Sequence, residues 1–340
     1  MGETVPDLGS EQMSQMIKGY WISQIVGTLA TLGIPDLLAE RALAYDELAK
    51  EIECEPRATY RLLRASASVG LVSAKPGNLF ALTPLGQTLR SNVAGSMRDT
   101  AIALTAPAHW LPWGRLADAI RWGQRQTPSC LGRELFQYYA ENPDENCAFT
   151  GAMSYGSALV AKEVTSVLDT SKAKHIVDVG GGSGTIMAAL LDMNPRLRGT
   201  ILELAYVVPR ARTVLAEQGL STRCEVVEGD FFKAVPEADI HILKRIIHDW
   251  DDEQSVRILS NCARALRKNG QVVLLERVLP EDERLSQTAL LDLNMLVLLP
   301  GCERTAKQFA DLFKAAGLQL DRISETASQV QVIVASAVSL

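Results

Sequence analysis

Residues His175–Gly184 read HIVDVGGGSG, and this stretch decides the fold of the chain. A short apolar run that includes an acid leads into glycines, and a helix-forming segment, Thr185–Asp192, follows. A strand, a glycine turn and a helix start in this order let the backbone approach a ligand closely and present unpaired N–H groups to it. The next apolar run, Gly199–Leu202, ends in Glu203, whose carboxylate can accept from both hydroxyls of a ribose. The segment therefore predicts a site for a nucleoside-containing cofactor.

The spacing of the glycines indicates which cofactor. Gly180, Gly182 and Gly184 give the pattern G-x-G-x-G, whereas the dinucleotide fingerprint G-x-G-x-x-G would need a glycine where Thr185 stands. Asp178 precedes the first glycine by two residues. A carboxylate there has the wrong charge for the pyrophosphate of NAD, but it suits the cationic sulfonium and the amino group of S-adenosylmethionine. We therefore expect S-adenosylmethionine as the cofactor.

Length and composition exclude several classes of protein. A chain of 340 residues with 47% hydrophobic residues can form one large or two moderate domains. The net charge of −6 gives no general attraction to nucleic acid or to anionic membranes, and no apolar run is long enough to span a bilayer. Six cysteines without a C-x-x-C pair indicate reduced thiols in the cytoplasm, and four histidines make a metal site unexpected. We expect a cytoplasmic protein that binds neither nucleic acid, membrane nor metal.

The N-terminal hundred residues predict a dimerisation domain. Residues 11–32 have the apolar spacing of an amphipathic helix with a broad hydrophobic face. Short helices and a small hairpin follow over residues 36–100, with a turn at Pro76-Gly77-Asn78, which is a winged-helix pattern. We expect residues 1–100 to form this domain and to hold a homodimer together.

The remaining residues, 101–340, predict a helical linker region followed by a catalytic domain. From residue 174 onward, apolar strand-like runs alternate with helical segments, which indicates a doubly wound, mostly parallel sheet. The last two runs, Leu318–Ile323 and Val330–Ala335, are separated by only six residues. That gap is too short for a helical crossover, so one terminal strand should be antiparallel. Such an ending resembles a Rossmann-like class I methyltransferase sheet more than a dinucleotide-binding one.

A second informative segment contains a candidate catalytic base. The strand that begins near Asp239 emerges at Lys244, so His248 lies beyond its carboxyl end, where ligands bind in open α/β sheets. A neutral imidazole there can take a proton from a hydroxyl group near neutral pH. Glu276 ends the next strand and Glu303 precedes another helix, so either carboxylate can orient the imidazole. For Glu303, stabilisation of the helix N-terminus is a competing interpretation.

Other residues are candidates for contacts with the cofactor and the acceptor substrate. Asp230 and Phe231 follow the third strand, where they could meet the amino group and the face of adenine. Packing in the core is the plain alternative for Phe231. A flat apolar pocket for a phenol or another aromatic hydroxyl could come from Trp21, His109, Trp110, Trp113, Met153 and Met295. Of these we select Trp110, Met153 and Met295, together with Asp249, as the expected substrate-binding residues.

Together these motifs resemble the small-molecule O-methyltransferases of the plant caffeate type and their bacterial relatives from antibiotic and other secondary-metabolite pathways. The resemblance covers nearly the whole chain and rests on DVGGGSG from Asp178, GDF from Gly229, IHDWDDE from Ile247, ERVLP from Glu276 and GCERT from Gly301. It implies methyl transfer from S-adenosylmethionine, a base at His248 bracketed by Glu276 and Glu303, and an N-terminal domain that lends residues to its partner's pocket. The expected cofactor-binding residues are Asp178, Gly180, Gly182, Glu203, Asp230, Phe231 and Lys244.

Three alternatives stay open at this stage. A DNA-binding regulator would use Arg57, Arg61 and Arg64 on the presumed recognition helix, but residues 40–100 carry eight basic and seven acidic side chains, a weak basic footprint. A relative with the same fold and cofactor could carry out chemistry other than methylation, although His248 and both glutamates are present. A dehydrogenase is disfavoured by the glycine spacing and by the antiparallel terminal strand.

Overall fold

The computed structural model describes residues 8–282 and 287–338, which form two compact units. The first comprises the described residues up to Trp110 together with Pro143–Tyr155, and the second comprises Leu111–Asn142 together with the described residues from Gly156 onward. This division differs from the expected boundary after residue 100, which falls inside α7 (Arg98–Thr105). The reason is a small contact cluster of Ala103, Ala148 and Ala152, which holds the start of α12 (Pro143–Val167) in the first unit.

The expected N-terminal helix is present as two segments, α1 (Leu8–Ile17) and α2 (Gly19–Thr31). Their apolar side chains have two different environments. Leu29 and Ala30, near the end of α2, are buried in the first unit, whereas Met16, Ile17 and Tyr20 are 69%, 66% and 54% exposed. Seven large apolar side chains of α1 and α2 lie at the surface: Leu8, Met13, Met16, Ile17, Tyr20, Trp21 and Ile22.

The winged-helix pattern expected for residues 36–100 is also present. Its core contains Leu48, Leu63 and Phe80. The helices are α3 (Ile34–Leu37), α4 (Tyr45–Glu51), α5 (Pro56–Ser68) and α6 (Pro84–Gln87), and the strands are β1 (Leu43–Ala44), β2 (Val72–Lys75) and β3 (Leu79–Leu82). The three strands form an antiparallel sheet in the order β1-β3-β2. The turn between β2 and β3 has left-handed φ angles at Gly77 (80°) and Asn78 (58°), the two residue types that adopt this conformation most readily.

Short helices lead from the first unit into the sheet of the second. They are α8 (Pro107–Trp113), α9 (Leu116–Trp122), α10 (Thr127–Leu131) and α11 (Leu135–Glu141). Proline opens three of the elements in this region, because Pro107, Pro128 and Pro143 stand at or next to the first helical position, where the missing N–H costs nothing. The helix that begins at Pro143, α12, continues to Val167, and its second half belongs to the second unit.

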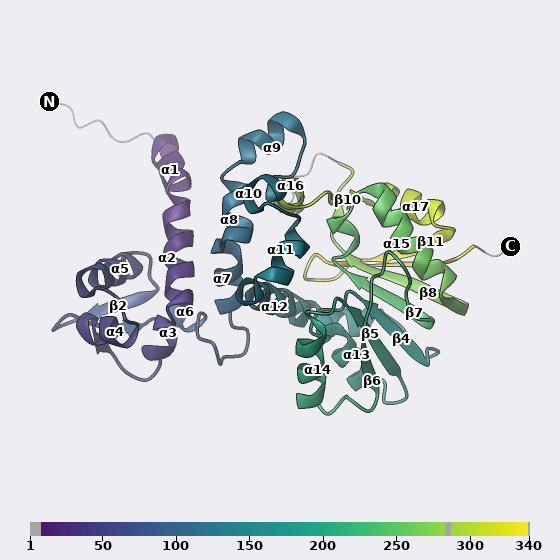
Figure 1. Cartoon of the computed structure of the whole chain (residues 1–340), viewed down its shortest axis with the longest axis horizontal. Helices are drawn as coiled ribbons and strands as arrows, with labels where there is room; N and C mark the ends of the chain where they lie inside the picture. Colours follow the sequence, from purple (N-terminus) through teal and green to yellow (C-terminus); the bar gives the residue numbers. More distant parts are fainter. Residues whose placement is uncertain (1–7, 283–286, 339–340) are drawn as a thin grey trace. The chain divides into compact units, whose positions relative to one another are not determined.

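The second unit is built on a seven-stranded sheet in the order β11-β12-β8-β7-β4-β5-β6. The strands are β4 (His175–Val179), β5 (Arg198–Glu203), β6 (Cys224–Glu228), β7 (Ala238–Lys244), β8 (Leu266–Glu276), β11 (Leu318–Ser324) and β12 (Gln331–Ala337). The strands from β8 to β6 pair in parallel, and β12 is antiparallel to both β8 and β11. The expected antiparallel terminal strand is therefore confirmed (Figure 1).

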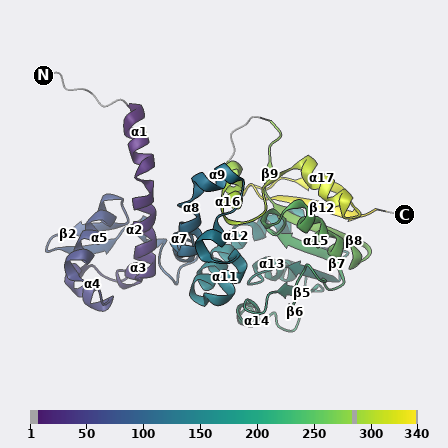
Figure 2. The same ribbon diagram turned by 45° about the horizontal axis from the view of Figure 1, so that its top comes forward.

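Both faces of this sheet are covered by helices, because successive residues of each strand enter opposite cores. Ile176, Ile201 and Ile242 pack in one cluster with α12, α13 (Thr185–Met193) and α14 (Val208–Glu217). Val177, Leu202 and Leu243 pack in another with α15 (Asp252–Arg264) and α17 (Ala306–Ala315), on the other face of the sheet (Figure 2).

The chain order reverses at β4, because β5 and β7 lie on its two sides. Ligands of open α/β sheets bind beside the carboxyl ends of the strands at such a switch point. The remaining elements complete this edge: the 3-10 helix Ile247–Asp249, β9 (Val278–Leu279), α16 (Thr288–Leu298) and β10 (Arg304–Thr305). Within the described residues, no helix is long and apolar enough to cross a membrane.

Candidate active site

The glycine turn after β4 has the backbone conformation that its sequence requires. Gly180, Gly182 and Gly184 have φ angles of 70°, 58° and 81°, which side chains rarely permit. At Gly180 a side chain would also collide with Ile246, whose Cδ1 would lie 2.6 Å from the added Cβ. The turn therefore keeps its backbone exposed to a ligand at the end of β4.

Glu203 holds this turn from the neighbouring strand. Its Oε1 accepts a hydrogen bond from Gly182 N at 3.0 Å, and its Oε2 accepts one from Leu204 N at 2.7 Å. Burial raises the pKa of Glu203, and these two backbone hydrogen bonds oppose the rise. Each carboxylate oxygen has a second lone pair, so the group can still accept from ribose hydroxyls.

Asp178 is a buried acid with an unused acceptor. It is 2% exposed, and its Oδ1 has no hydrogen-bond partner among the described residues. Burial, followed by the neighbouring Glu203, raises its pKa to about 7, while Lys244 opposes the rise. Burial in turn lowers the pKa of Lys244 to about 8. A buried, partly unsatisfied carboxylate beside a glycine turn fits a cationic group of a bound cofactor.

Asp230 and Phe231 stand just beyond β6, as expected. The Oδ1 of Asp230 accepts from Phe232 N at 2.9 Å, and its Oδ2 lies 3.3 Å from Lys233 Nζ. Phe231 is partly buried, and its ring centroid lies 5.0 Å from Phe232 and 6.1 Å from Trp250. The aromatic packing that the sequence allowed for Phe231 is therefore present, and its role toward adenine stays a prediction.

His248 is buried in the short 3-10 helix beyond β7 and is hydrogen-bonded on one side to a carboxylate. Its Nδ1 lies 2.6 Å from Glu303 Oε1, which fixes the hydrogen on Nδ1 because a carboxylate accepts. The opposite nitrogen, Nε2, lies 3.3 Å from Asp249 Oδ1. The imidazole thus has one nitrogen engaged by Glu303 and the other available as a proton acceptor.

Glu276 contacts the backbone of this segment more closely than the imidazole. Its Oε1 accepts from Ile246 N and Ile247 N at 3.0 Å each, and its Oε2 lies 3.9 Å from His248 Nδ1. Burial raises the pKa of Glu276 to about 7 against the lowering effect of His248. Burial also raises the pKa of Asp249 to about 8, against the lowering effect of Arg245. The site therefore combines several carboxyl groups that gain or lose a proton close to neutral pH.

His248, Glu276 and Glu303 are also a possible set of metal ligands, since one ligand atom from each lies within 4.8 Å of the others. The distances argue for a hydrogen bond instead. Two ligands about 2.0 Å from one tetrahedral ion stand roughly 3.3 Å apart. The 2.6 Å between Nδ1 and Glu303 Oε1 is shorter than that.

Glu303 is brought to the imidazole by residues that the sequence analysis did not select. Asp292 Oδ1, on α16, accepts from Glu303 N at 2.8 Å. Gly301 lies directly against the histidine, because a Cβ on it would stand 2.0 Å from His248 O. Arg304 is 1% exposed and binds the same segment. The sequence PGCERT at residues 300–305 could have indicated these contacts, because a glycine and a charged pair follow an apolar helix there.

The four expected substrate-binding residues belong to two different units. Trp110 and Met153 are in the first unit, and Asp249 and Met295 are in the second. Met295 is 4% exposed. Nearby in the second unit, Trp113 Nε1 donates to Asn294 Oδ1 at 2.8 Å, so this tryptophan has a defined polar partner.

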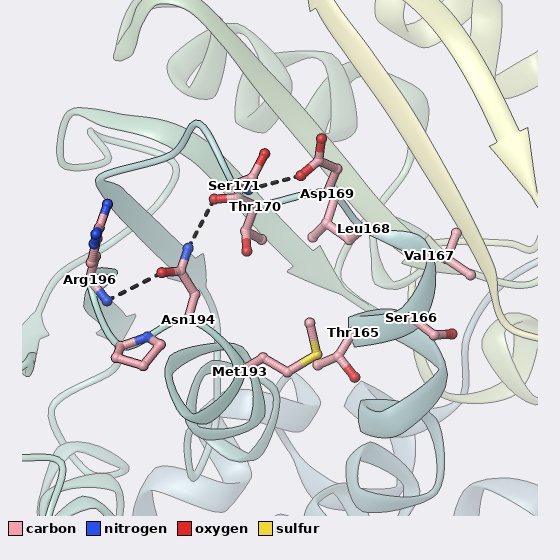
Figure 3. Close-up of a pocket in the computed structure, with 11 residues that line it drawn as sticks. Thr165, Ser166, Val167, Leu168, Asp169, Thr170, Ser171, Met193, Asn194 and Arg196 are labelled. Atoms are coloured by element: carbon pink, nitrogen blue, oxygen red, sulfur yellow. Dashed lines mark hydrogen bonds between the residues drawn. The ribbon is translucent and has the colours of Figure 1, made fainter.

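A cavity of about 620 Å³ lies away from these residues. Its lining comes from the end of α12, the segment Leu168–Ser171, Met193 at the end of α13 and the residues 194–196 that follow it (Figure 3). These segments precede β4 and β5, so the cavity lies at the strand beginnings, whereas Asp178, Glu203 and His248 lie at or beyond the strand ends. The cavity therefore plays no part in the candidate active site.

Comparison with known proteins identifies the family. An O-methyltransferase domain model matches residues 113–319, and an O-methyltransferase dimerisation domain model matches residues 14–92. The chain is 37% identical over 325 residues to the phenazine O-methyltransferase PhzM of Lysobacter antibioticus, covering 95% of both chains. It is 34% identical to the aclacinomycin 10-hydroxylase RdmB of Streptomyces purpurascens, over 86% of this chain and 79% of that protein.

Among solved structures, human N-acetylserotonin methyltransferase in complex with S-adenosylmethionine superposes with a TM-score of 0.88 at 27% identity, covering 100% of both chains. The expected cofactor and fold class are thereby confirmed, and the dimerisation domain supports the expected homodimer. The chain belongs to the family of S-adenosylmethionine-dependent O-methyltransferases that carry an N-terminal dimerisation domain.

Proposed function

We propose that this enzyme methylates a phenolic or heteroaromatic hydroxyl group of a small secondary metabolite, with His248 as the general base. The observation that carries the proposal is the buried hydrogen bond of 2.6 Å between His248 Nδ1 and Glu303 Oε1. This bond holds the neutral imidazole in the tautomer whose Nε2 lacks a hydrogen. That nitrogen can accept the hydroxyl proton while the oxygen attacks.

The residues around the glycine turn fit the cofactor. The backbone of Gly180 and Gly182 would lie against it, Glu203 would accept from its ribose, and Asp230 and Phe231 would face its adenine. Asp178 and Lys244 would supply one negative and one positive charge to its amino acid part. The cofactor supplies a methyl group on a sulfonium whose charge is neutralised on transfer, so exclusion of water favours the reaction.

The remaining task of the protein is to place the acceptor hydroxyl between the methyl group and His248 Nε2. Asp249 lies beside that nitrogen and is proposed to contact the acceptor. Trp110, Met153 and Met295 are proposed to contact its ring. Holding the two reactants in line contributes more to the rate than the strength of the base, because a well-oriented pair reacts as if at very high concentration.

The test is methyl transfer itself. The purified enzyme is incubated with S-adenosylmethionine labelled in the methyl group and a panel of phenols and hydroxylated heteroaromatics, and the products are separated by mass. We expect a product heavier by one methyl group on oxygen. If label is consumed only into N-methyl products, the hydroxyl part of the proposal is wrong.

A second candidate function is a different reaction on the same fold and cofactor, because the hydroxylase relative is 34% identical. In that case the panel would give oxygenated or rearranged products and no transferred label.

We further propose that the enzyme acts in the cytoplasm and not on DNA. All six cysteines are free thiols, and residues 40–100 of the winged-helix region have a net charge of only +1.

A further inference from the structure

The turn that carries His248 has two polar ends. In a short helical turn, the first N–H groups and the last C=O groups have no partner within the turn. The N–H end therefore favours an anion and the C=O end favours a cation. At the N–H end, Glu276 Oε1 accepts from Ile246 N and Ile247 N. The other end requires a buried donor.

Arg304 supplies that donor. Its Nη1 donates to Ile247 O at 2.9 Å and to Cys302 O at 3.4 Å, and its Nη2 donates to Trp250 O at 2.8 Å. The two carbonyls Ile247 O and Trp250 O flank His248 along the chain. Ser255 Oγ lies 3.3 Å from each of these oxygens, and its single hydroxyl hydrogen can be shared between them.

The remaining donors of Arg304 bind Asp252. Nε and Nη2 donate to Asp252 Oδ1 at 3.0 and 2.7 Å. All five N–H groups of the guanidinium therefore have an acceptor, as a buried arginine needs. The two side chains differ sharply in exposure, since that of Arg304 is 1% exposed and that of Asp252 is 78% exposed. Arg304 thus links the buried turn of His248 to a carboxylate at the surface. We call the hydrogen-bonded pair of Arg304 and Asp252 the clamp.

We propose that Arg304 is a positioning residue for His248 and that Asp252 holds Arg304 in place. The inference rests on the proposed function only where it concerns the rate of methyl transfer. Consecutive residues act on the same histidine in two ways: Glu303 binds the imidazole, and Arg304 binds the carbonyls on either side of it. The direction of Nε2 is set by both together, since a displacement of about 1 Å in a catalytic group is costly.

The exposed end of the clamp permits a test that leaves the core intact. Asp252→Ala removes the carboxylate that binds Arg304, and Glu253→Ala removes the neighbouring carboxylate in the same first turn of α15. Both variants lose one negative charge at one helix N-terminus, so the difference between them reports the contact with Arg304. We expect Asp252→Ala to lower the single-turnover rate about three- to tenfold, with affinity for S-adenosylhomocysteine changed less than twofold. Glu253→Ala should behave as the wild type.

A direct variant and a spectroscopic signal complete the experiment. Arg304→Lys keeps the charge but loses the planar fork, so it should lower the rate more than Asp252→Ala does, about ten- to a hundredfold. The hydrogen on His248 Nδ1 should give a downfield proton NMR signal that disappears in Glu303→Gln. That signal should shift or broaden in Asp252→Ala and stay unchanged in Glu253→Ala.

The outcomes distinguish the positioning role of Arg304 from the proposed role of His248 as the general base. If Asp252→Ala and Glu253→Ala match in both rate and proton signal, or if folded Arg304→Lys keeps the wild-type values, Arg304 does not position His248. If the signal moves in Asp252→Ala while the rate does not, the clamp exists but His248 is not the base, and the proposed function fails instead. Circular dichroism of each variant checks that the chain is folded.

Discussion

At the scale of the residue, His248 carries the most direct prediction. His248→Ala should lower the single-turnover rate about 10²- to 10⁴-fold, because the general base is lost. Affinity for S-adenosylhomocysteine should be nearly unchanged, since the proposed cofactor contacts lie at the ends of β4, β5, β6 and β7 and do not include His248. Glu303→Gln should cause a smaller loss, because Glu303 orients the imidazole and does not take the proton. Wild-type rates in His248→Ala at pH 7 would remove this residue from the mechanism.

Asp178 predicts how cofactor binding depends on pH. Its pKa is raised to about 7, so the acid is largely neutral below that pH and must ionise to neutralise a cation. Binding should therefore release a proton, and affinity for S-adenosylmethionine should fall as pH decreases below about 7. Titration calorimetry in buffers of different ionisation enthalpy measures this release. Asp178→Asn should weaken binding and abolish the pH dependence between pH 6 and 8, and a persistent dependence in that variant would assign the proton elsewhere.

The roles of single residues were predictable from the sequence to different degrees. Asp178, Glu203 and His248 stand at strand ends, and alternating strands and helices reveal where strands end. Asp292, Gly301 and Arg304 were not selected. Their importance comes from contacts that sequence periodicity does not show: the Arg304 side chain binds Ile247 O, Asp292 binds Glu303 N, and Gly301 lies against the backbone of His248. Periodicity shows which face of an element is buried, but it does not show which loops meet.

At the scale of the element, the loop Pro300–Glu303 depends on one glycine. Gly301→Ala places a Cβ 2.0 Å from His248 O and 2.5 Å from Asp249 C, and these backbone atoms cannot rotate away. We expect a loss of about 1–3 kcal/mol in the free energy of unfolding and at least a tenfold loss of rate. Urea unfolding and single-turnover kinetics measure the two effects.

The neighbouring Cys302→Ala is the matched control, because it shortens a partly buried side chain in the same loop without a backbone collision. It should stay within about 1.5 kcal/mol of the wild type. Equal effects in the two variants would show that the close approach of Gly301 is unimportant.

Short elements were harder to predict than long ones. The sequence predicted the parallel strands and the hairpin of β2 and β3, whose patterns are strongly periodic. It did not predict β1, β9 or β10, each of two residues. Such strands are too short to show alternation, and they form because a neighbouring chain segment lies alongside them, as Arg304 pairs with Val278.

At the scale of the whole molecule, the exposed apolar residues of α1 and α2 predict a homodimer. Ile17, the last residue of α1, and Trp21, in the first turn of α2, are 66% and 51% exposed. Each large apolar side chain contributes about 1.5–3 kcal/mol when it is fully buried. Sedimentation equilibrium should give twice the chain mass of 37.0 kDa.

A single charge in this surface should separate the subunits. Ile17→Lys should shift the equilibrium toward the monomer, whereas Gln15→Lys adds the same charge at an exposed polar position and should leave the dimer intact. Removing residues 1–32 should give an insoluble or inactive protein. A monomeric wild-type enzyme at micromolar concentration would contradict the prediction.

The position of β12 has a consequence for the order in which the protein is made. This strand, Gln331–Ala337, lies between β8 and β11 in the sheet, although it follows both in the sequence and is the last strand among the described residues. During synthesis, β11 emerges first but has no strand to pair with until β12 is present, and β8 keeps an open edge. The ribosome must release the chain as far as Ala337 before the sheet can close. Loss of the chain from Gln331 onward, in a nascent or proteolysed protein, would therefore expose two unpaired strand edges at once, which is a recognised cause of aggregation.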